Sequence, residues 1–196
     1  MTQLLLFIAA FVLTYVGVGF FRRWSVRRAI LDVPNERSSH KTPTPRGGGL
    51  VIVTVCLGFY LLNAVLSGGV FVPGYFGGAL LIALVSWFDD LKSVAPPVRF
   101  LVHAVAAGLA VFSLGGWPAL YFPPAGEIKF GLIGSFLAVL WVIWLTNAYN
   151  FMDGIDGIAG MQALTAGIGW LLLGGFFAAE TVSLLSGVLA FSSLGF

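Results

Sequence analysis

The chain has little of what a soluble domain needs. Only 9% of its 196 residues are charged and 59% are hydrophobic, so polar residues are too few to cover a water-exposed surface. A single cysteine, Cys56, excludes an internal disulfide. A net charge of +2 without any nucleic-acid-binding motif gives no support to a nucleic-acid partner. The low content of charged residues and the high content of hydrophobic residues predict an integral membrane protein.

The apolar segments predict about seven membrane spans. The first, 4–21, has no basic residue before it and four arginines after it, the reverse of a signal peptide's charge order, so it is interpreted as a retained transmembrane helix. Gly, Pro or charged residues separate the others, which are expected near 48–66, 75–88, 98–114, 132–149, 158–177 and 181–196. The expected fold is an all-α, polytopic transmembrane helix bundle, with 1–196 as a single membrane-embedded domain.

The basic residues indicate how these spans are oriented. If successive loops alternate between the two sides, nine of the ten Lys and Arg residues fall on one face and Lys129 on the other. The positive-inside rule makes the first face cytoplasmic and places the N-terminus outside. The nine are Arg22, Arg23, Arg27, Arg28, Arg37, Lys41, Arg46, Lys92 and Arg99. The opposite loops, 67–74 and 115–131, are rich in Gly and Pro and are expected to be connectors.

Acidic and amide residues gather at the ends of predicted spans on the cytoplasmic face. They are Asp89 and Asp90 after one span, and Asn147, Asn150, Asp153 and Asp156 after another. Carboxylates are costly at a membrane boundary unless they meet a cation or face water, so this placement predicts a shared site for a metal and a phosphorylated substrate. Because adjacent carboxylates repel each other, a cation, Lys92 or Arg99, is expected close to Asp89 and Asp90.

Neighbouring residues of the second cluster are one helical turn apart, so each pair can point in nearly the same direction. A straight helix rotates each successive member by about 60°, so convergence of the whole set needs a helix break, which Gly154 and Gly157 permit. The alternative is that these residues merely cap helix ends.

The polar loop predicted over 22–47 has features of a phosphate-binding segment. Glycines at 47–49 permit backbone N–H groups to approach an anion, and His40, Lys41 and Arg46 add donors. An ordinary solvated loop with basic topology signals is the alternative.

Arg99 and His103 lie one turn apart at the start of the fourth span and suit a lipid phosphate. A snorkelling arginine and a buried histidine are the commoner roles for such residues.

Ordered motifs carry a family resemblance. They are Asp32-Val-Pro-Asn-Glu-Arg-Ser-Ser-His, Pro43-Thr-Pro-Arg-Gly-Gly-Gly, Phe88-Asp-Asp and Asn147-Ala-Tyr-Asn-Phe-Met-Asp-Gly-Ile-Asp-Gly. Over about residues 31–160 the chain resembles the polyprenyl-phosphate N-acetylhexosamine-1-phosphate transferases, glycosyltransferase family 4. The resemblance is closest to the branch that initiates O-antigen or related bacterial polysaccharides.

The resemblance implies transfer of an N-acetylhexosamine 1-phosphate from a UDP-sugar to polyprenyl (undecaprenyl) phosphate, with release of UMP, in the bacterial inner membrane. It implies Mg²⁺ or Mn²⁺ as the cofactor, because both reactants are anions. The implied catalytic residues are Asp89 and Asp90, the metal site includes Asn150 and Asp153, and the substrate-binding residues are Asp156, Asn147, His40, Lys41, Arg46 and Arg99. Segments 89–97 and 147–157 would form the cytoplasmic active site.

Family members continue beyond the position of Phe196 with another metal ligand and a histidine-bearing loop, so the chain is expected to be the N-terminal part of a longer transferase. Expected partners are polyprenyl phosphate, a UDP-N-acetylhexosamine and membrane lipids, with a homodimer left open. Two other classes remain: a noncatalytic membrane fragment or subunit, and an ion-coupled transporter. A transporter's coupling site is expected near the bilayer midplane rather than at span ends.

Overall fold

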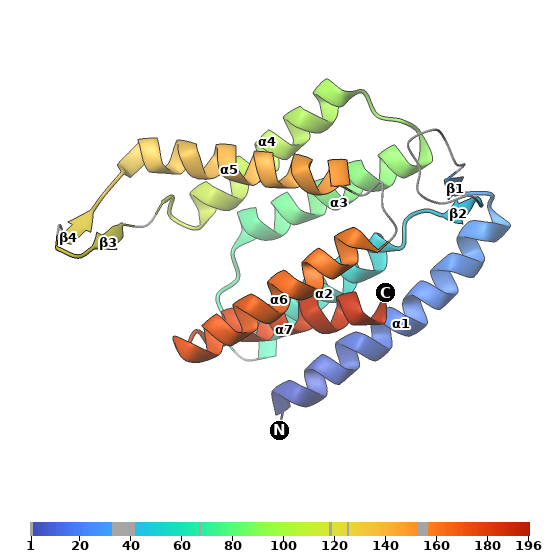
Figure 1. Ribbon diagram of the computed structural model, residues 1–196, viewed down its shortest axis with the longest axis horizontal. Coiled ribbons are helices and arrows are strands. Elements are labelled where there is room, and N and C mark those ends of the chain that lie inside the picture. The colour runs from blue at the N-terminus through green and yellow to red at the C-terminus, as the bar shows by residue number, and fades with distance from the viewer. Residues whose placement is uncertain (1, 33–41, 67, 118, 125, 153–156) are drawn as a thin grey trace. The chain divides into compact units, whose positions relative to one another are not determined.

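A computed structural model describes the chain except for residues 1, 33–41, 67, 118, 125 and 153–156. The described part contains helices and two small antiparallel strand pairs (Figure 1). The helices are α1 (Thr2–Arg27), α2 (Gly49–Leu66), α3 (Pro73–Leu91), α4 (Pro96–Ser113), α5 (Gly131–Met152), α6 (Ile158–Phe176) and α7 (Glu180–Gly195). Within the described residues, six helices are long and apolar enough to cross a membrane, and α7 is shorter at 16 residues. The prediction of an all-α polytopic bundle is confirmed.

The helices follow the predicted spans closely but extend further at their polar ends. α1 continues to Arg27, so the expected loop over 22–47 begins later than the sequence suggested. α3 runs to Leu91 and includes Asp89 and Asp90 in its last turn. Hydropathy marks only the apolar part of a helix, whereas backbone hydrogen bonding continues into residues whose long or charged side chains reach the polar region.

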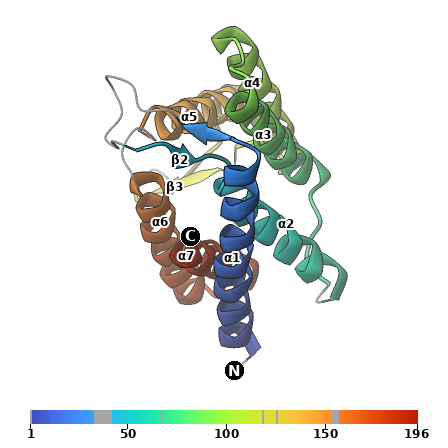
Figure 2. The ribbon, with the colours of Figure 1, turned by 90° about the vertical axis from the view of Figure 1, so that its right-hand side faces the viewer.

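The chain divides into two compact units, Met1–Phe71 with Met152–Phe196 and Val72–Phe151. In the first unit, α7 packs against α1, α2 and α6 (Figure 2). The buried residues of α7 are mostly Gly, Ala and Ser: Ser183, Leu184, Gly187, Val188, Ala190, Ser192, Ser193 and Gly195. Small residues allow helix backbones to approach closely, which favours helix association in lipid.

Glycines lie at the closest contacts of the first unit. A Cβ added at Gly195 would lie 2.5 Å from the carbonyl oxygen of Phe11 in α1. A Cβ added at Gly167 of α6 would lie 2.9 Å from the backbone nitrogen of Ala190. These contacts leave no room for a side chain, so α7 is positioned by backbone-to-backbone packing.

In the second unit, α3 and α4 pack against each other (Figure 1). Small residues lie at this contact. A Cβ added at Gly74 would lie 2.4 Å from the carbonyl oxygen of Leu109, and one at Gly78 would lie 2.7 Å from that of Ala106. Gly74 and Gly78 are one turn apart and therefore face the same side of α3. Their spacing sets the close approach of the two helices.

The strands are short. β1 (Leu31–Asp32) pairs with β2 (Thr44–Pro45) in the first unit. β3 (Leu120–Phe122) pairs with β4 (Gly126–Ile128) in the second. The loop over 115–131 was expected to be only a connector, but its aromatic and β-branched residues favour a strand pair.

Candidate active site

The turn between α3 and α4 positions one carboxylate of the predicted catalytic pair. The side chain of Asp89 accepts a hydrogen bond from the Val94 N–H at Oδ1, 2.8 Å, and pairs with Arg99 Nη1 at Oδ2, 2.5 Å. α3 ends at Leu91, and the next residue, Lys92, is extended. α4 begins at Pro96, a position at which the backbone N–H of a helix has no partner within the helix, so proline loses no hydrogen bond there. The tight reversal brings the first turn of α4 back over the end of α3.

The expected cation beside the aspartate pair is therefore Arg99. The side chains of Asp89 and Arg99 are only 25% and 29% exposed, so their attraction is less screened than that of a surface pair. Lys92, the other predicted candidate, is exposed. Asp90 is half-buried beside Asp89. Each carboxylate oxygen has two lone pairs, so Asp89 keeps acceptor capacity after its two bonds are made.

The C-terminal end of α5 carries Asn147 and Asn150. Asn147 is half-buried and its Nδ2 donates to the carbonyl oxygen of Ile143, 2.8 Å, whereas Asn150 is exposed. α5 ends at Met152 and α6 begins at Ile158, with Gly157 in the left-handed region at φ 78°. Of the two glycines expected to break the helix, Gly157 is thus in a non-helical conformation. Gly154, Asp153 and Asp156 lie outside the described residues.

His103 lies buried in the second turn of α4. It is only 4% exposed, and its Nδ1 has no hydrogen-bond partner among the described residues. The prediction of a buried histidine is confirmed. The ion pair of Asp89 with Arg99 places a polar contact at the start of α4.

In the first unit, Arg46 is tied to the strand pair. Its guanidinium forms an ion pair with Asp32, and its N–H donates to the carbonyl oxygen of Ile30, 3.2 Å. Buried Ser25 also donates to the Ile30 carbonyl, 2.6 Å. His40 and Lys41, the other predicted phosphate donors, lie outside the described residues. The structure therefore gives Arg46 an anionic partner within the chain.

The glycines after Arg46 have different roles. Gly47 has φ 86°, a conformation that favours glycine and turns the chain into α2. A Cβ on Gly48 would lie 2.5 Å from the ring of Phe196, so a larger residue here would require that side chain to move. Nothing lies within 4 Å of a Cβ added at Gly49.

Oxygen donors are available for a cation, although no group of three or more His, Cys, Asp or Glu side chains that suits a metal occurs among the described residues. Of the two predicted metal ligands, Asn150 is described and exposed. The Asn150 amide and the carboxylates of Asp89 and Asp90 are hard oxygen donors, which Mg²⁺ prefers, so the residues present fit such an ion.

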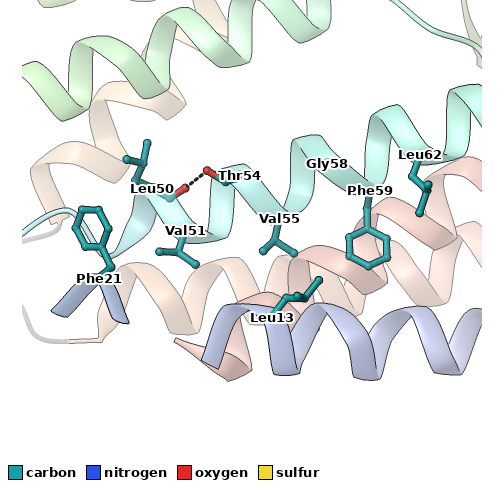
Figure 3. Close-up of a pocket in the computed structure, with 9 residues that line it drawn as sticks. All are labelled: Leu13, Phe21, Leu50, Val51, Thr54, Val55, Gly58, Phe59 and Leu62. Carbon is teal, nitrogen blue, oxygen red and sulfur yellow. Dashed lines mark hydrogen bonds between the residues drawn. The ribbon is translucent and has the colours of Figure 1, made fainter. Parts of the chain in front are cut away.

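An apolar groove of about 560 Å³ lies between α1 and α2 in the first unit (Figure 3). Its walls include Leu13 and Phe21 from α1 and Phe59 from α2. Its polar side chain, Thr54, donates to the carbonyl oxygen of Leu50, 2.8 Å. Because that hydroxyl is already bonded within its own helix, the groove offers apolar surface rather than chemistry.

Comparison with known proteins identifies the family. The sequence profile described as Glycosyl transferase family 4 matches residues 72–196, more than half of the chain and the whole of α3 to α7. The chain belongs to glycosyl transferase family 4. The matched region contains the positions of Asp89, Asp90 and Asn150.

Curated relatives of this glycosyl transferase family 4 chain come from mycobacteria. Decaprenyl-phosphate N-acetylglucosaminephosphotransferase of Mycolicibacterium smegmatis is 31% identical over 143 residues, covering 68% of this chain and 35% of the relative. The protein of the same name from Mycobacterium tuberculosis H37Rv is 30% identical over 126 residues, 61% of this chain and 31% of the relative. The Mycobacterium leprae protein is 30% identical over 126 residues, 61% and 32%. The chain spans about a third of the length of these relatives.

Proposed function

We propose that the protein transfers N-acetylhexosamine 1-phosphate from a UDP-sugar to a polyprenyl phosphate such as undecaprenyl phosphate. An oxygen of the polyprenyl phosphate attacks the phosphorus that carries the sugar. A polyprenyl-diphospho-sugar forms, and the bond to the other phosphate breaks to release UMP. The observation that carries the proposal is the Asp89–Arg99 pair beside Asp90, at the end of a membrane-length helix in a family 4 chain.

The geometry supports separate tasks for the two aspartates. Arg99 and the Val94 N–H fix Asp89, so we assign Asp89 to orienting the lipid phosphate rather than to removing a proton. A phosphate monoester has a second pKa of about 6 and is mostly ionised at neutral pH, which makes a strong base unnecessary. Asp90, the next residue, is assigned to the same lipid phosphate.

Mg²⁺ would be held by Asn150 and Asp153, and when bound would neutralise the negative charge that accumulates on the diphosphate. Asp156 and Asn147 are assigned to the nucleotide, and His40, Lys41, Arg46 and Arg99 to phosphate groups. The bias of basic residues supports a cytoplasmic site in a bacterial inner membrane, with the N-terminus outside. We propose the first membrane step of cell-envelope polysaccharide synthesis, such as O-antigen, as the pathway position.

The test is release of UMP. Membranes that contain the 196-residue chain, or the complete product of its reading frame, are supplied with undecaprenyl phosphate, Mg²⁺ and a panel of UDP-N-acetylhexosamines. Release that depends on the lipid and is reversibly abolished by a chelator is expected, and the panel identifies the sugar. Absence of release from both samples, while the M. tuberculosis relative is active in parallel, would overturn the proposal and favour a noncatalytic membrane protein.

A further inference from the structure

The apolar groove between α1 and α2 has the length of a lipid chain in one leaflet. Phe21 lines it beside Leu50, at the start of α2, and Leu62 lines its other end (Figure 3). A helix advances by about 18 Å between these two positions of α2, and one leaflet contributes about 15 Å of hydrocarbon core. Leu13 and Leu62 are 54% and 43% exposed, so the walls of the groove still offer apolar surface.

The side chains that follow Phe21 on α1 change from apolar to cationic. Trp24 and Arg28 follow at spacings of three and four residues, so they lie on the same helix face. The ring centroids of Phe21 and Trp24 are 5.3 Å apart. The N–H of Arg28 donates to the carbonyl oxygen of Trp24, 3.0 Å, so the helical turn continues to Arg28. Helical side chains lean toward the N-terminus, which directs the guanidinium back toward the groove.

This order matches the order of groups in a phospholipid. The apolar groove corresponds to the acyl chain, and tryptophan is typical of the membrane interface, where the glycerol lies. Arg28 follows at the depth of the phosphate, and arginine binds phosphate oxygens through two parallel hydrogen bonds.

The positive charge at this end of α1 is not neutralised within the described part of the chain. Arg28 is exposed, as are Arg22, Arg23 and Arg27. None of the four forms an ion pair with another described residue. Four cations immediately after a membrane span attract anionic lipids. A neutral lipid would fill the groove equally well but would leave this charge without a partner.

We propose that the groove holds one acyl chain of an anionic phospholipid, with the lipid phosphate at Arg28. The chain covers the exposed walls that α1 and α2 contribute, and the phosphate neutralises the guanidinium, so the lipid links the two helices. A fatty acyl chain fits a groove of one leaflet's depth, whereas a polyprenyl chain is much longer. The lipid is therefore a bound component of the membrane and is distinct from the polyprenyl acceptor.

The role of the phosphate is tested by counting retained lipids with native mass spectrometry. The detergent-purified chain receives equal amounts of phosphatidylglycerol and phosphatidylcholine with identical oleoyl chains, so that only the headgroup differs. Retained phosphatidylglycerol should exceed phosphatidylcholine by about fivefold, and Arg28→Gln should remove most of this excess. Arg23→Gln is the matched control, because it removes the same charge from another face of α1 and should lower retention by less than about twofold. Equal retention of the two lipids, or equal losses in the two variants, would overturn the proposal.

The place of the acyl chain is tested by filling the groove. Gly58 lines the groove, and nothing lies within 4 Å of a Cβ added there, so Gly58→Leu occupies open space without displacing other side chains. The variant should lower phosphatidylglycerol retention by about fivefold, because the acyl chain loses apolar contact. Gly19→Leu is the control, since a Cβ there also meets nothing within 4 Å and Gly19 does not line the groove. Retention unchanged by Gly58→Leu would contradict the proposal, whatever Arg28→Gln does.

The same spectra identify other occupants. A dimer of this chain that Gly58→Leu dissociates would assign the groove to a second copy, and displacement of phosphatidylglycerol by an equal amount of undecaprenyl phosphate would assign it to the acceptor. Either result would overturn the proposal. None of these measurements requires release of UMP, so the lipid site and the proposed function succeed or fail separately.

Discussion

In the unit formed by α1, α2, α6 and α7, helices meet mainly through small residues, whereas in the unit of α3, α4 and α5 an ion pair also joins two helix ends. α7 buries mainly Gly, Ala and Ser against its neighbours. The second unit has the comparable contact of Gly78 with Ala106, and adds the ion pair of Asp89 with Arg99.

This difference separates two requirements of a membrane enzyme. Lipid gives helices no hydrophobic reason to associate, so close backbone packing and hydrogen bonds hold them together. Packing of small residues depends mainly on shape and permits several polar arrangements. The directional ion pair between the end of α3 and the start of α4 restricts those arrangements, and it occurs in the unit that contains Asp89, Asp90 and Asn150.

The largest expected effect comes from removing a directional bond at the proposed site. Asp89→Asn deletes the charge that Arg99 pairs with and should reduce the rate of UMP release by about 100-fold or more, the range seen when a positioned polar group is lost. Glu127→Gln is the matched control, since Glu127 pairs with Lys129 at 4.0 Å where both side chains are mostly exposed. Near-normal transfer by Asp89→Asn would contradict the site assignment.

Helix positions were predictable from the sequence because each apolar run is bounded by Gly, Pro or charge. The span expected over 48–66 is α2, Gly49–Leu66. The sequence also offered Lys92 or Arg99 as the cation for Asp89, but the choice depends on the turn geometry, in which Lys92 caps α3 and Arg99 folds back.

Contacts between distant residues were not predictable in this way. Arg46 stays a predicted phosphate ligand, but the sequence did not indicate that the pairing of β1 with β2 brings its guanidinium to Asp32. Periodicity identifies elements, whereas the partner of a polar side chain depends on how those elements pack.

The next largest effect is expected from overpacking a close helix contact in the first unit. A Cβ on Gly174 would lie 2.7 Å from the backbone nitrogen of Ser183, close to the short turn that joins α6 to α7 and prevents the helices from separating. Gly174→Ala should lower the free energy of unfolding by about 1–3 kcal/mol, the usual cost of overpacking. Thermal unfolding in detergent measures the change. Gly175→Ala, where nothing lies within 4 Å, is the neighbouring control, and an equal loss in both variants would contradict the packing argument.

A smaller effect is expected at the equivalent contact of the second unit. The Cβ of Gly78→Ala would lie 2.7 Å from the Ala106 carbonyl oxygen, but Gly78 is far along α3 from the turn into α4, so the helices have freedom to separate there. We expect a loss of about 1 kcal/mol in the free energy of unfolding. Gly77→Ala meets nothing within 4 Å and should leave stability unchanged or slightly raised. A larger loss for Gly77→Ala than for Gly78→Ala would show that helix propensity, not close approach, dominates.

The smallest effect should follow Cys56→Ala. Cys56 lies within α2 and is a partly buried residue at the edge of the cluster of Phe7, Phe59 and Val188, so removal of its sulfur should change the free energy of unfolding by less than about 1 kcal/mol. UMP release should remain at the parent rate, because the first unit is expected to respond to changes of shape and not to the loss of one weakly polar atom. A large fall in transfer with unchanged unfolding would contradict this expectation, since it would give the thiol a chemical role that packing does not explain.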